Sequence, residues 1–505
     1  MANYIGIDLG TSSVKLLLVD QDGTILREVS KDYPCSYPHP GWSEQDPADW
    51  KRQVFAGIRE LCAGAAGDAA DDAAAIDPAS IRTIGIGGQM HGLVVLDEND
   101  NVIRPAILWN DGRTEKQTRY LNDVVGKEML SACTGNIAFA GFTAPKILWM
   151  KENEPDLFAR IKKVMLPKDY INYVLTGVHA TDVSDASGML LLDVAHKCWS
   201  EKMLELCSLK EEQMPKIFES ADRIGTLRPE IAQELGLSPD TFVIAGAGDN
   251  AAAAIGTGTI GEGTCNLSLG TSGTIFLPQT EFHTDSNNSL HAFAHADGHF
   301  HLMGCMLSCA SCNKWLMEEI YHTDDFDGEQ GAIKEEALGN NHVFFLPYLM
   351  GERSPINDAN ARAAFIGMTM DTSRTDLVQA VLEGVAFGIR DSLEAARALG
   401  IHPSRSTLCG GGAKSILWRK ILAAVLNVKL DILKTEQGPG MGAAMLAMVA
   451  DGAYESIAAA CDHIVEVVET IEPNPELVAR YDQRYQEFHL LYPALKDFFE
   501  TLAEK

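Results

Sequence analysis

One short pattern occurs twice in the chain and limits how it can fold. Residues 5–12 read Ile-Gly-Ile-Asp-Leu-Gly-Thr-Ser, and residues 266–273 read Asn-Leu-Ser-Leu-Gly-Thr-Ser-Gly, about 260 positions later. In both copies an apolar strand ends at a glycine, and small hydroxyl residues follow. Such a turn offers backbone N–H groups and hydroxyls to phosphate oxygens, although one copy alone would equally suit a tight structural hairpin. The two copies predict two related halves that hold one polyphosphate.

The length and the charge of the chain narrow the class of protein. Its 505 residues exceed one ordinary core and predict two domains of about 250 residues each. The chain has 41 Lys and Arg against 70 Asp and Glu, a net charge of −29 that disfavours nucleic acids and anionic membranes as partners. An anionic nucleotide would therefore need a local cation, which points to Mg²⁺. Since there is no leader segment and no apolar run of about 18 residues, we expect a cytoplasmic protein.

The 11 cysteines are expected to be reduced thiols and not a disulfide framework. Cys305, Cys309 and Cys312 need separate consideration, because their C-x₃-C-x₂-C spacing resembles an iron–sulfur binding run. On a helix, this spacing would place all three on one face. The small and apolar residues around them favour a tightly packed helix over a metal site.

The order of apolar runs and turn residues predicts sheets that alternate with helices. A β-meander opens the chain, a helix begins near Pro47, and the Ala- and Asp-rich segment 63–80 is expected to be a solvated helix end and loop. Residues 114–233 are expected to be mainly helical. The second half repeats the plan, so we place the domain boundary between residues 252 and 253. The predicted strands are 4–10, 14–20, 25–29, 81–86, 93–97, 103–108, 241–245, 265–269 and 274–278, with a hairpin turn at 297–298.

Two carboxylates have unusual positions in this pattern. Asp8 lies in an otherwise apolar strand, where a carboxylate is costly unless it faces a cation or several donors. Beside a phosphate-binding turn, hydrated Mg²⁺ is a natural partner, and capping of the turn is the structural alternative. Asp249 follows a strand and a Gly-Ala-Gly turn and precedes Asn250, which suits either a pre-oriented general base or a helix N-cap. Lys15, on the next strand, is expected to face solvent.

Two loops contain further candidate ligand contacts. Met90 and His91 stand between glycines at the end of a strand, which suits contact with a small polar ligand, although a lone histidine is usually structural. Trp109 and Asp111 could contact a ligand, or they could be a core anchor and a turn residue.

Glycine-rich turns at residues 410–413 and 438–442 precede predicted helices and are weak signals by themselves. Neither has the P-loop pattern, and no dinucleotide-binding pattern follows the first strand. The sequence therefore disfavours both of these common nucleotide-binding architectures.

Together these motifs resemble the FGGY carbohydrate kinases, and most closely the bacterial members of that family that act on xylulose. The similarity extends over nearly the whole chain, from the strand at residues 5–12 to the helix after Gly442. Its most specific parts, in chain order, are Gln89-Met90-His91-Gly92, Trp109-Asn110-Asp111-Gly112-Arg113, residues 245–250, Gly351-Glu352-Arg353-Ser354-Pro355 and residues 384–391.

The resemblance implies an α/β fold of two actin-like, ribonuclease-H-like domains around a central cleft, with sugar held by residues 1–252 and nucleotide by residues 253–505. It also implies that Asp249 is the catalytic base and that Asp8 lies beside Mg²⁺. The implied sugar contacts are Met90, His91, Asp249 and Asn250. The implied nucleotide contacts are Gly10, Thr11, Ser12, Gly270 and Thr271 at the phosphates, Gly411, Gly412 and Ala413 at the adenosine, and Asn427 near the base. The resemblance leaves open whether Lys15, Trp109, Asp111 and Arg353 act directly.

The activity implied by the resemblance is transfer of a phosphoryl group from ATP, with Mg²⁺, to a ketopentose, above all D-xylulose to D-xylulose 5-phosphate. Relatives that phosphorylate glycerol have Arg-Glu where this chain has Met90 and His91, which favours a pentulose. Elementary chemistry points to the same mechanism, because a sugar hydroxyl is a weak nucleophile and a carboxylate must orient it and accept its proton. The expected partners are a small ketose and ATP, and a homodimer is a family expectation.

Three other functions stay open. The chain could be a family member that acts on ribulose, gluconate or glycerol. It could be an actin- or Hsp70-like ATPase that uses the same nucleotide clamp to drive a partner, or a catalytically silent sugar sensor. ATP turnover that depends on a free ketose would separate these hypotheses.

Overall fold

The computed structural model describes residues 2–63, 76–285, 287–435 and 437–503. The chain forms two compact units that interleave in sequence. The first unit comprises residues 1–260, 292–300 and 437–465, and the second unit comprises residues 261–291, 301–436 and 466–505. The first unit thus continues past residue 252 and takes up two later segments. Most of the predicted loop at 63–80 lies outside the described residues.

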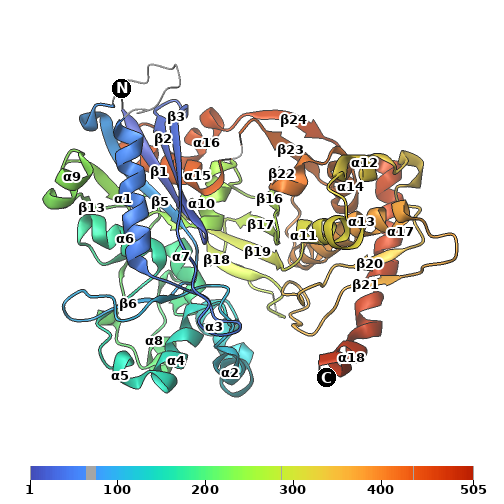
Figure 1. The fold of residues 1–505 in the computed structure, drawn as a ribbon, viewed down its shortest axis with the longest axis horizontal. Helices are drawn as coiled ribbons and strands as arrows, with labels where there is room; N and C mark the ends of the chain where they lie inside the picture. The colour runs from blue at the N-terminus through green and yellow to red at the C-terminus, as the bar shows by residue number, and fades with distance from the viewer. Residues whose placement is uncertain (1, 64–75, 286, 436, 504–505) are drawn as a thin grey trace. The chain divides into compact units, whose positions relative to one another are not determined.

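The main sheet of the first unit is built from β1 (Asn3–Leu9), β2 (Ser13–Asp20), β3 (Ile25–Asp32), β5 (Ile81–Gly88), β13 (Arg223–Thr226), β14 (Phe242–Ile244) and β15 (Ala247–Gly248) (Figure 1). Its strand order is β13-β14-β5-β1-β2-β3, with β15 also paired to β5. β1, β2 and β3 are antiparallel, which confirms the predicted meander, and β5 runs parallel to β1.

Shorter strands complete the first unit. They are β4 (Glu44–Gln45), β6 (Val94–Leu96), β7 (Ala106–Ile107), β8 (Lys163–Met165), β9 (Ala180–Asp182), β10 (Leu192–Asp193), β11 (Cys198–Trp199) and β12 (Lys216–Phe218). The strand predicted over 103–108 is wrong in its length, because only β7 forms there. Pro105 directly precedes β7, and proline has no N–H to donate to a ladder.

Helices cover both faces of the main sheet of the first unit (Figure 1). α1 (Pro47–Ala63) packs on one face, and α10 (Asp249–Gly256) and α15 (Gly438–Asp451) pack on the other. Successive side chains of a strand point to opposite faces, so Ile5 and Ile7 join the core with Trp50 of α1, whereas Tyr4 joins the core with Ala444 of α15.

The glycine-rich run 438–442 forms the first turn of α15 itself. A Cβ atom on Gly6 would lie 2.0 Å from the carbonyl oxygen of Gly440, and one on Gly85 would lie 2.2 Å from that of Ala443. Only glycine lets the helix approach β1 and β5 this closely. A segment from late in the sequence is thereby packed into the first unit.

The segment 114–233 carries most of the remaining helices of the first unit, as predicted, together with the strands β8 to β13. These helices are α2 (Glu115–Arg119), α3 (Lys127–Thr134), α4 (Thr143–Asn153), α5 (Pro155–Phe158), α6 (Pro167–Thr176), α7 (Val183–Ala186), α8 (Glu201–Cys207) and α9 (Pro229–Leu235); α16 (Ile457–Ile464) follows α15.

The second unit repeats the pairing scheme of the first. Its sheet contains β16 (Thr264–Leu269), β17 (Gly273–Gln279), β19 (Phe300–Met306), β22 (Arg405–Cys409), β23 (Lys429–Leu433) and β24 (Val467–Ile471), in the order β19-β17-β16-β22-β23-β24. β16 is antiparallel to β17 and parallel to β22, as β1 is to β2 and β5. The α/β class and the repeated plan predicted from the sequence are therefore confirmed.

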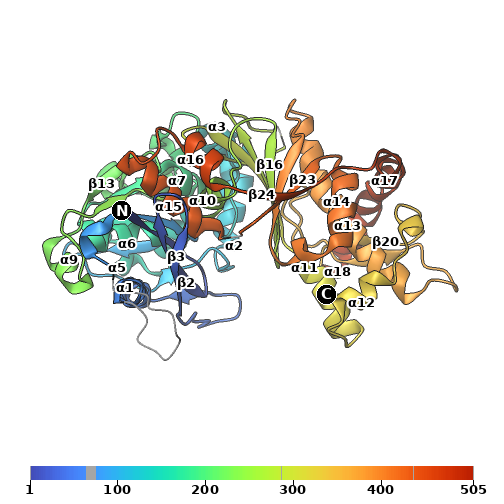
Figure 2. The ribbon, with the colours of Figure 1, turned by 90° about the horizontal axis from the view of Figure 1, so that it is seen from above.

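Helices pack beside this second sheet: α13 (Arg374–Arg397) contacts β17 and α14 (Ile416–Leu426), and α14 contacts β23 and β24 (Figure 2). The unit also contains α11 (Ala310–Trp315), α12 (Phe326–Gly331), α17 (Pro475–Phe488), α18 (Leu491–Ala503), β20 (Phe344–Leu346) and β21 (Ala364–Ile366). The predicted turn at 297–298 joins β18 (His291–Ala294) to β19.

None of the helices in the described parts of the chain has the length and apolar character needed to cross a bilayer.

The prediction that three cysteines share one helix face is wrong. Cys305 lies in β19, Cys309 precedes α11, and only Cys312 lies in that helix. The spacing rule fails because the chain changes from strand to helix between the first and the last of them. All 11 cysteines are free thiols.

Candidate functional site

The carboxyl ends of neighbouring strands bring the two unusual carboxylates to one edge of the first sheet. β1 and β15 both pair with β5 in parallel, so Asp8 and Ala247 lie level with Gly87 on its two sides. Asp249 directly follows β15 and begins α10. The edge at which parallel strands end is where α/β proteins bind their ligands.

Asp249 is the first residue of α10, and the capping position belongs to Gly248. The side chain is half-buried, and its Oδ1 accepts hydrogen bonds from the backbone N–H of Asn250 at 2.7 Å and from Nδ2 of Asn250 at 3.0 Å. Burial raises the pKa of Asp249 to about 6, although these two bonds favour the charged form. A carboxyl group with such a pKa can take up a proton near neutral pH, as a general base must.

Asp8 lies opposite Lys15 in the β1–β2 pair. Burial and then the negative charge of Asp249 raise the pKa of Asp8 to about 7, while the charge of Lys15 lowers it. Lys15 is 28% exposed, and its Nζ lies 3.0 Å from Oε1 of Glu28. Lys15 thus influences the site through its charge.

These two carboxylates fit a hydrated divalent cation. Burial destabilises the charged form of both, and a bound cation would offset that effect. Within the described ranges, no three His, Cys, Asp or Glu side chains cluster closely enough to cage a metal ion. Mg²⁺ suits this arrangement, since it keeps several of its waters and takes one or two carboxylates.

The first turn (Gly10-Thr11-Ser12) is held through its carbonyl groups. Tyr33 Oη and Gln89 Nε2 donate to the carbonyl oxygen of Gly10, at 3.2 Å for Gln89. Gln45 Nε2 donates to the carbonyl oxygen of Thr11 at 2.6 Å. The N–H groups of Thr11 and Ser12 donate to no other residue that the structure describes. The turn therefore offers donors to a phosphate group and keeps its carbonyl oxygens engaged.

Met90 and His91 follow β5, where the chain turns sharply because His91 has a left-handed backbone (φ 68°). Nδ1 of His91 lies 2.7 Å from the carbonyl oxygen of Gly188, and its ring stacks on Phe142 with 4.7 Å between centroids. A carbonyl oxygen only accepts, so Nδ1 of His91 carries a proton in this contact. A Cβ atom on Gly248 would lie 3.0 Å from Sδ of Met90, so Met90 packs against the segment before Asp249.

Asp111 and Trp109 have different surroundings. The Asp111 carboxylate is buried and accepts hydrogen bonds from the N–H of Ser43 at 2.6 Å and from Nε and NH2 of Arg113 at 2.9 Å and 2.7 Å. It therefore holds loops of the first unit together. Trp109 is partly exposed, and its Nε1 donates to Oγ1 of Thr11 at 2.9 Å, which links it to the first turn.

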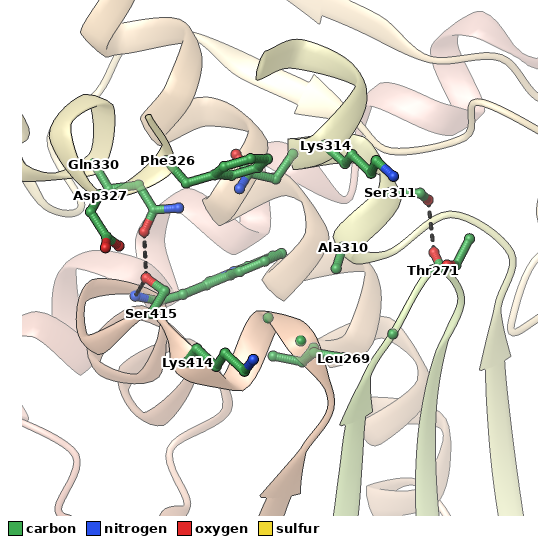
Figure 3. A pocket seen from close by; sticks show the side chains of 15 residues that line it. Leu269, Thr271, Ala310, Ser311, Lys314, Phe326, Asp327, Gln330, Lys414 and Ser415 are labelled. Carbon is green, nitrogen blue, oxygen red and sulfur yellow. Dashed lines mark hydrogen bonds between the residues drawn. The ribbon is translucent and has the colours of Figure 1, made fainter. Parts of the chain in front are cut away.

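A cavity of about 680 Å³ lies in the second unit (Figure 3). Four predicted nucleotide contacts line it: Gly270, Thr271, Gly411 and Gly412. The sequence did not reveal the other lining residues, which are Leu269, Ala310, Ser311, Asn313, Lys314, Phe326, Asp327, Gln330, Lys414, Ser415 and Trp418. Leu269, Lys414 and Ser415 could have been found, because Leu269 directly precedes the second Gly-Thr-Ser turn and the other two directly follow a glycine-rich run. A mainly apolar wall with a few polar and cationic groups is typical of small-molecule pockets.

The second turn (Gly270-Thr271-Ser272) is held as the first one is. The carbonyl oxygen of Gly270 accepts the N–H of Ala310 at 2.9 Å. That of Thr271 accepts the N–H of Cys309 at 3.0 Å and Oγ of Ser311 at 2.7 Å (Figure 3). In both units, therefore, the chain itself engages the carbonyl groups of the turn.

Two predicted nucleotide contacts do not line this cavity. Ala413 is buried, and Asn427 ends α14 in a left-handed conformation (φ 52°), a C-terminal position that asparagine suits. Their roles at the nucleotide stay predictions.

The motif at 351–355 connects to β19. Glu352 is buried, and its Oε1 accepts the backbone N–H groups of Leu307 and Arg353, both at 2.8 Å. Burial raises the pKa of Glu352 to about 8. NH1 of Arg353 lies 4.0 Å from Sγ of Cys305, so the motif packs on the end of β19.

Two α/β units, each with a Gly-Thr-Ser turn suited to phosphate, and two carboxyl groups with raised pKa values at one sheet edge are features expected of a small-molecule kinase. The chain belongs to the FGGY family of carbohydrate kinases: the family models of the N-terminal and C-terminal domains match residues 3–256 and 265–451. The family resemblance, the two-domain actin-like and ribonuclease-H-like fold and the carbohydrate kinase class predicted from the motifs are thereby confirmed.

Several known proteins and structures are similar to this chain over nearly their whole length. A xylulose kinase of Escherichia coli (strain K12) is 39% identical over 494 residues, which cover 97% of this chain and 99% of that protein. The crystal structure of a xyloylose kinase from Brucella ovis has a TM-score of 0.91 and 40% identity, with 98% and 100% of the two chains covered. That of a gluconate kinase from Lactobacillus acidophilus has a TM-score of 0.92 and 27% identity, with 99% of both chains covered.

Proposed function

We propose that this chain transfers the γ-phosphoryl group of ATP, with Mg²⁺, to a ketopentose, and that D-xylulose is its substrate. The observation that carries the proposal is the position of Asp249, a carboxyl group with a pKa of about 6 at the same sheet edge as Asp8 and next to the segment against which Met90 packs. The relatives from Escherichia coli and Brucella ovis support the choice of sugar. The fold does not decide it, since the gluconate kinase structure is equally similar.

In this mechanism Asp249 orients the attacking hydroxyl of the sugar and accepts its proton. Both hydrogen bonds from Asn250 use Oδ1, so Oδ2 is the oxygen that faces the sugar. His91 would contribute a polar contact to the sugar, and Met90 would contribute an apolar contact. These groups would select a ketose by its hydroxyl pattern, because an unmatched hydroxyl in such a site loses a hydrogen bond.

The phosphate groups would be held by backbone donors and by Asp8 with its cation. The first turn offers the N–H groups of Thr11 and Ser12. Mg²⁺ held near Asp8 would supply positive charge to the transferring phosphoryl group. Exclusion of water matters here, because water is the smaller competitor for the same group.

The second unit would bind the nucleotide in its cavity. The adenosine would contact Phe326 and Gly411, which both line the cavity, and the phosphates would approach the second turn. Lys314, Lys414 and Asp327 line the same cavity, so its lining has one more cationic than anionic side chain within a chain of net charge −29. An anionic nucleotide needs such a local excess of positive charge.

A coupled ADP-release assay over D-xylulose, D-ribulose, L-ribulose, glycerol and gluconate tests the proposal. We expect D-xylulose to give the highest kcat/KM and ADP release without any sugar to be far slower. A higher kcat/KM with another acceptor would mean that this acceptor, and not D-xylulose, is the substrate. Turnover that no acceptor increases would favour the ATPase hypothesis, and no turnover at all would favour the silent sensor.

A further inference from the structure

A group of buried charged side chains lies directly behind the segment that carries Asp249. This buried ion cluster consists of Lys168, Asp169, Asp182 and Asp185, whose side chains have no exposed surface. Nζ of Lys168 lies 2.8 Å from Asp169, 3.1 Å from Asp182 and 3.7 Å from Asp185. Burying charges costs free energy, and such clusters are often no better for stability than apolar residues of the same size. A role in placing particular atoms would account for it.

Ser184 connects this cluster to the Asp249 segment. Its hydroxyl donates to Oδ2 of Asp182 at 2.5 Å, and its Oγ accepts the backbone N–H of Gly248 at 3.1 Å. The hydroxyl has one hydrogen, which it donates to the Asp182 carboxylate. The lone pairs of Oγ are therefore left to accept the backbone N–H of Gly248. Gly248 immediately precedes Asp249, so this chain of bonds ends one residue from the base.

Lys168 holds the other end of the same segment. Its Nζ donates to the carbonyl oxygen of Ala245 at 3.1 Å, and Nδ2 of Asn172 donates to the same oxygen at 2.9 Å. Between the two held ends the chain turns sharply at Gly246, which has a left-handed backbone (φ 75°). A Cβ atom on Gly246 would lie 2.1 Å from the carbonyl oxygen of Ile86, so the turn is packed tightly against β5.

The hydrogen bonds within the cluster differ among its carboxyl groups. Oδ2 of Asp182 accepts three donors, the N–H and hydroxyl of Ser184 and the hydroxyl of Ser220. Neither oxygen of Asp185 accepts a hydrogen bond from the described chain, and burial raises its pKa well above the ordinary value. Asp182 is therefore the acceptor that orients the Ser184 hydroxyl.

We propose that Ser184, oriented by Asp182 and Lys168, is a positioning residue that sets where α10 begins and hence where the Asp249 carboxylate points. This inference rests on the proposed function of Asp249 as the base. Displacing a reacting group by about 1 Å can lower a rate on the order of 10²-fold. Loss of the Ser184 contact should therefore lower the rate of transfer and leave nucleotide binding intact.

Ser220 provides a matched control. Its hydroxyl donates to the same Oδ2 of Asp182, at 2.8 Å, and the residue is equally buried. The difference is that the backbone N–H of Gly248 donates to the hydroxyl of Ser184 and not to that of Ser220. We expect Ser184→Ala to lower kcat for the ketose about 10–100-fold and to change the KM for ATP less than about threefold. Ser220→Ala should lower kcat less than about threefold. Hydrogen exchange in a peptide that contains Gly248 should become faster in Ser184→Ala only.

Ser184→Cys keeps the volume of the site but offers a much weaker acceptor, so it tests the contact even if Ser184→Ala fails to fold. The kcat of Ser184→Cys should fall as that of Ser184→Ala does. Equal losses in the Ser184 and Ser220 variants, or no loss in either Ser184 variant, would overturn the positioning role. The wild-type protein is assayed alongside: its failure to phosphorylate any ketose would refute the proposed function, whereas an active wild type with unaffected Ser184 variants would refute only this inference.

Discussion

Nζ of Lys146 lies 2.8 Å from the carbonyl oxygen of His91, and Oγ1 of Thr143 donates to the same oxygen at 3.0 Å. Lys146 is fully buried, and its Nζ also donates to the carbonyl oxygen of Gly141 at 2.6 Å. Burial lowers the pKa of Lys146 well below its ordinary value. Both donors come from α4, so this helix holds the proposed sugar-binding loop in its left-handed conformation.

Replacing Lys146 with methionine should weaken ketose binding. A left-handed backbone at a residue other than glycine costs about 1–2 kcal/mol, and without Lys146 the His91 loop loses one of the contacts that offset this cost. We expect the KM for the ketose to rise about tenfold and the KM for ATP to stay within about twofold. Lys151→Met, on the exposed side of the same helix, is the control. An unchanged ketose KM in Lys146→Met would show that the loop holds its conformation without this lysine.

Replacing Asp249 with asparagine should abolish most of the catalytic activity and leave nucleotide binding unchanged. The amide keeps the shape of the side chain but cannot accept the proton, so kcat should fall by about 10²–10⁴-fold. Calorimetry should show unchanged nucleotide binding, and Asp240→Asn, on an exposed loop, should behave as the wild type. Wild-type turnover in Asp249→Asn would exclude Asp249 as the base.

The carboxyl groups at the site should make stability fall as the pH rises. The pKa of Asp8 is raised to about 7 and that of Asp249 to about 6, so between pH 4 and 7 the folded protein binds more protons than the unfolded chain. The contribution of these two carboxyl groups to the free energy of unfolding is present at low pH, and it is lost as the pH rises through about 7.

Asp8→Asn should therefore have a higher Tm than the wild type at about pH 8 without Mg²⁺, and the difference should shrink at about pH 5. Differential scanning calorimetry at the two pH values measures this. Adding Mg²⁺ at the higher pH should raise the Tm of the wild type more than that of Asp8→Asn. A Tm of Asp8→Asn that lies below the wild type at both pH values would mean that the Asp8 carboxylate is stabilising.

Replacing Gly411 with alanine should impair nucleotide use without affecting the fold. A Cβ atom there meets no chain atom within 4 Å, yet Gly411 lines the cavity of the second unit. An extra methyl group against a bound ligand costs about 1–3 kcal/mol, so the KM for ATP should rise about tenfold or more at unchanged Tm. Gly331→Ala is the control, because its Cβ also meets nothing within 4 Å and Gly331 does not line the cavity. If both variants keep the wild-type KM, the nucleotide lies elsewhere.

The duplicated turns and the two carboxylates could be predicted from the sequence because each is a local signal. Residues 5–12 contain a complete strand and turn, and the antiparallel pairing of β1 with β2 needs only the next few residues. Asp8 stood out as a charge in an apolar strand, and Asp249 as a charge after a glycine turn. By contrast, the helical face assigned to Cys305 was wrong, because spacing does not reveal where β19 ends and α11 begins.

By itself the sequence determined the central strands of both sheets, the repeated plan and the unusual positions of Asp8 and Asp249, since these depend on residues a few positions apart. Only the tertiary structure decided that Gly440 of α15 packs on Gly6, that Lys146 reaches His91, and that Ser184 ties Asp182 to Gly248. These contacts join residues that are far apart along the chain, so no local pattern encodes them. The pKa of Asp249 is raised for the same reason: burial is a property of the segments that surround a side chain, and they come together only when the chain has folded.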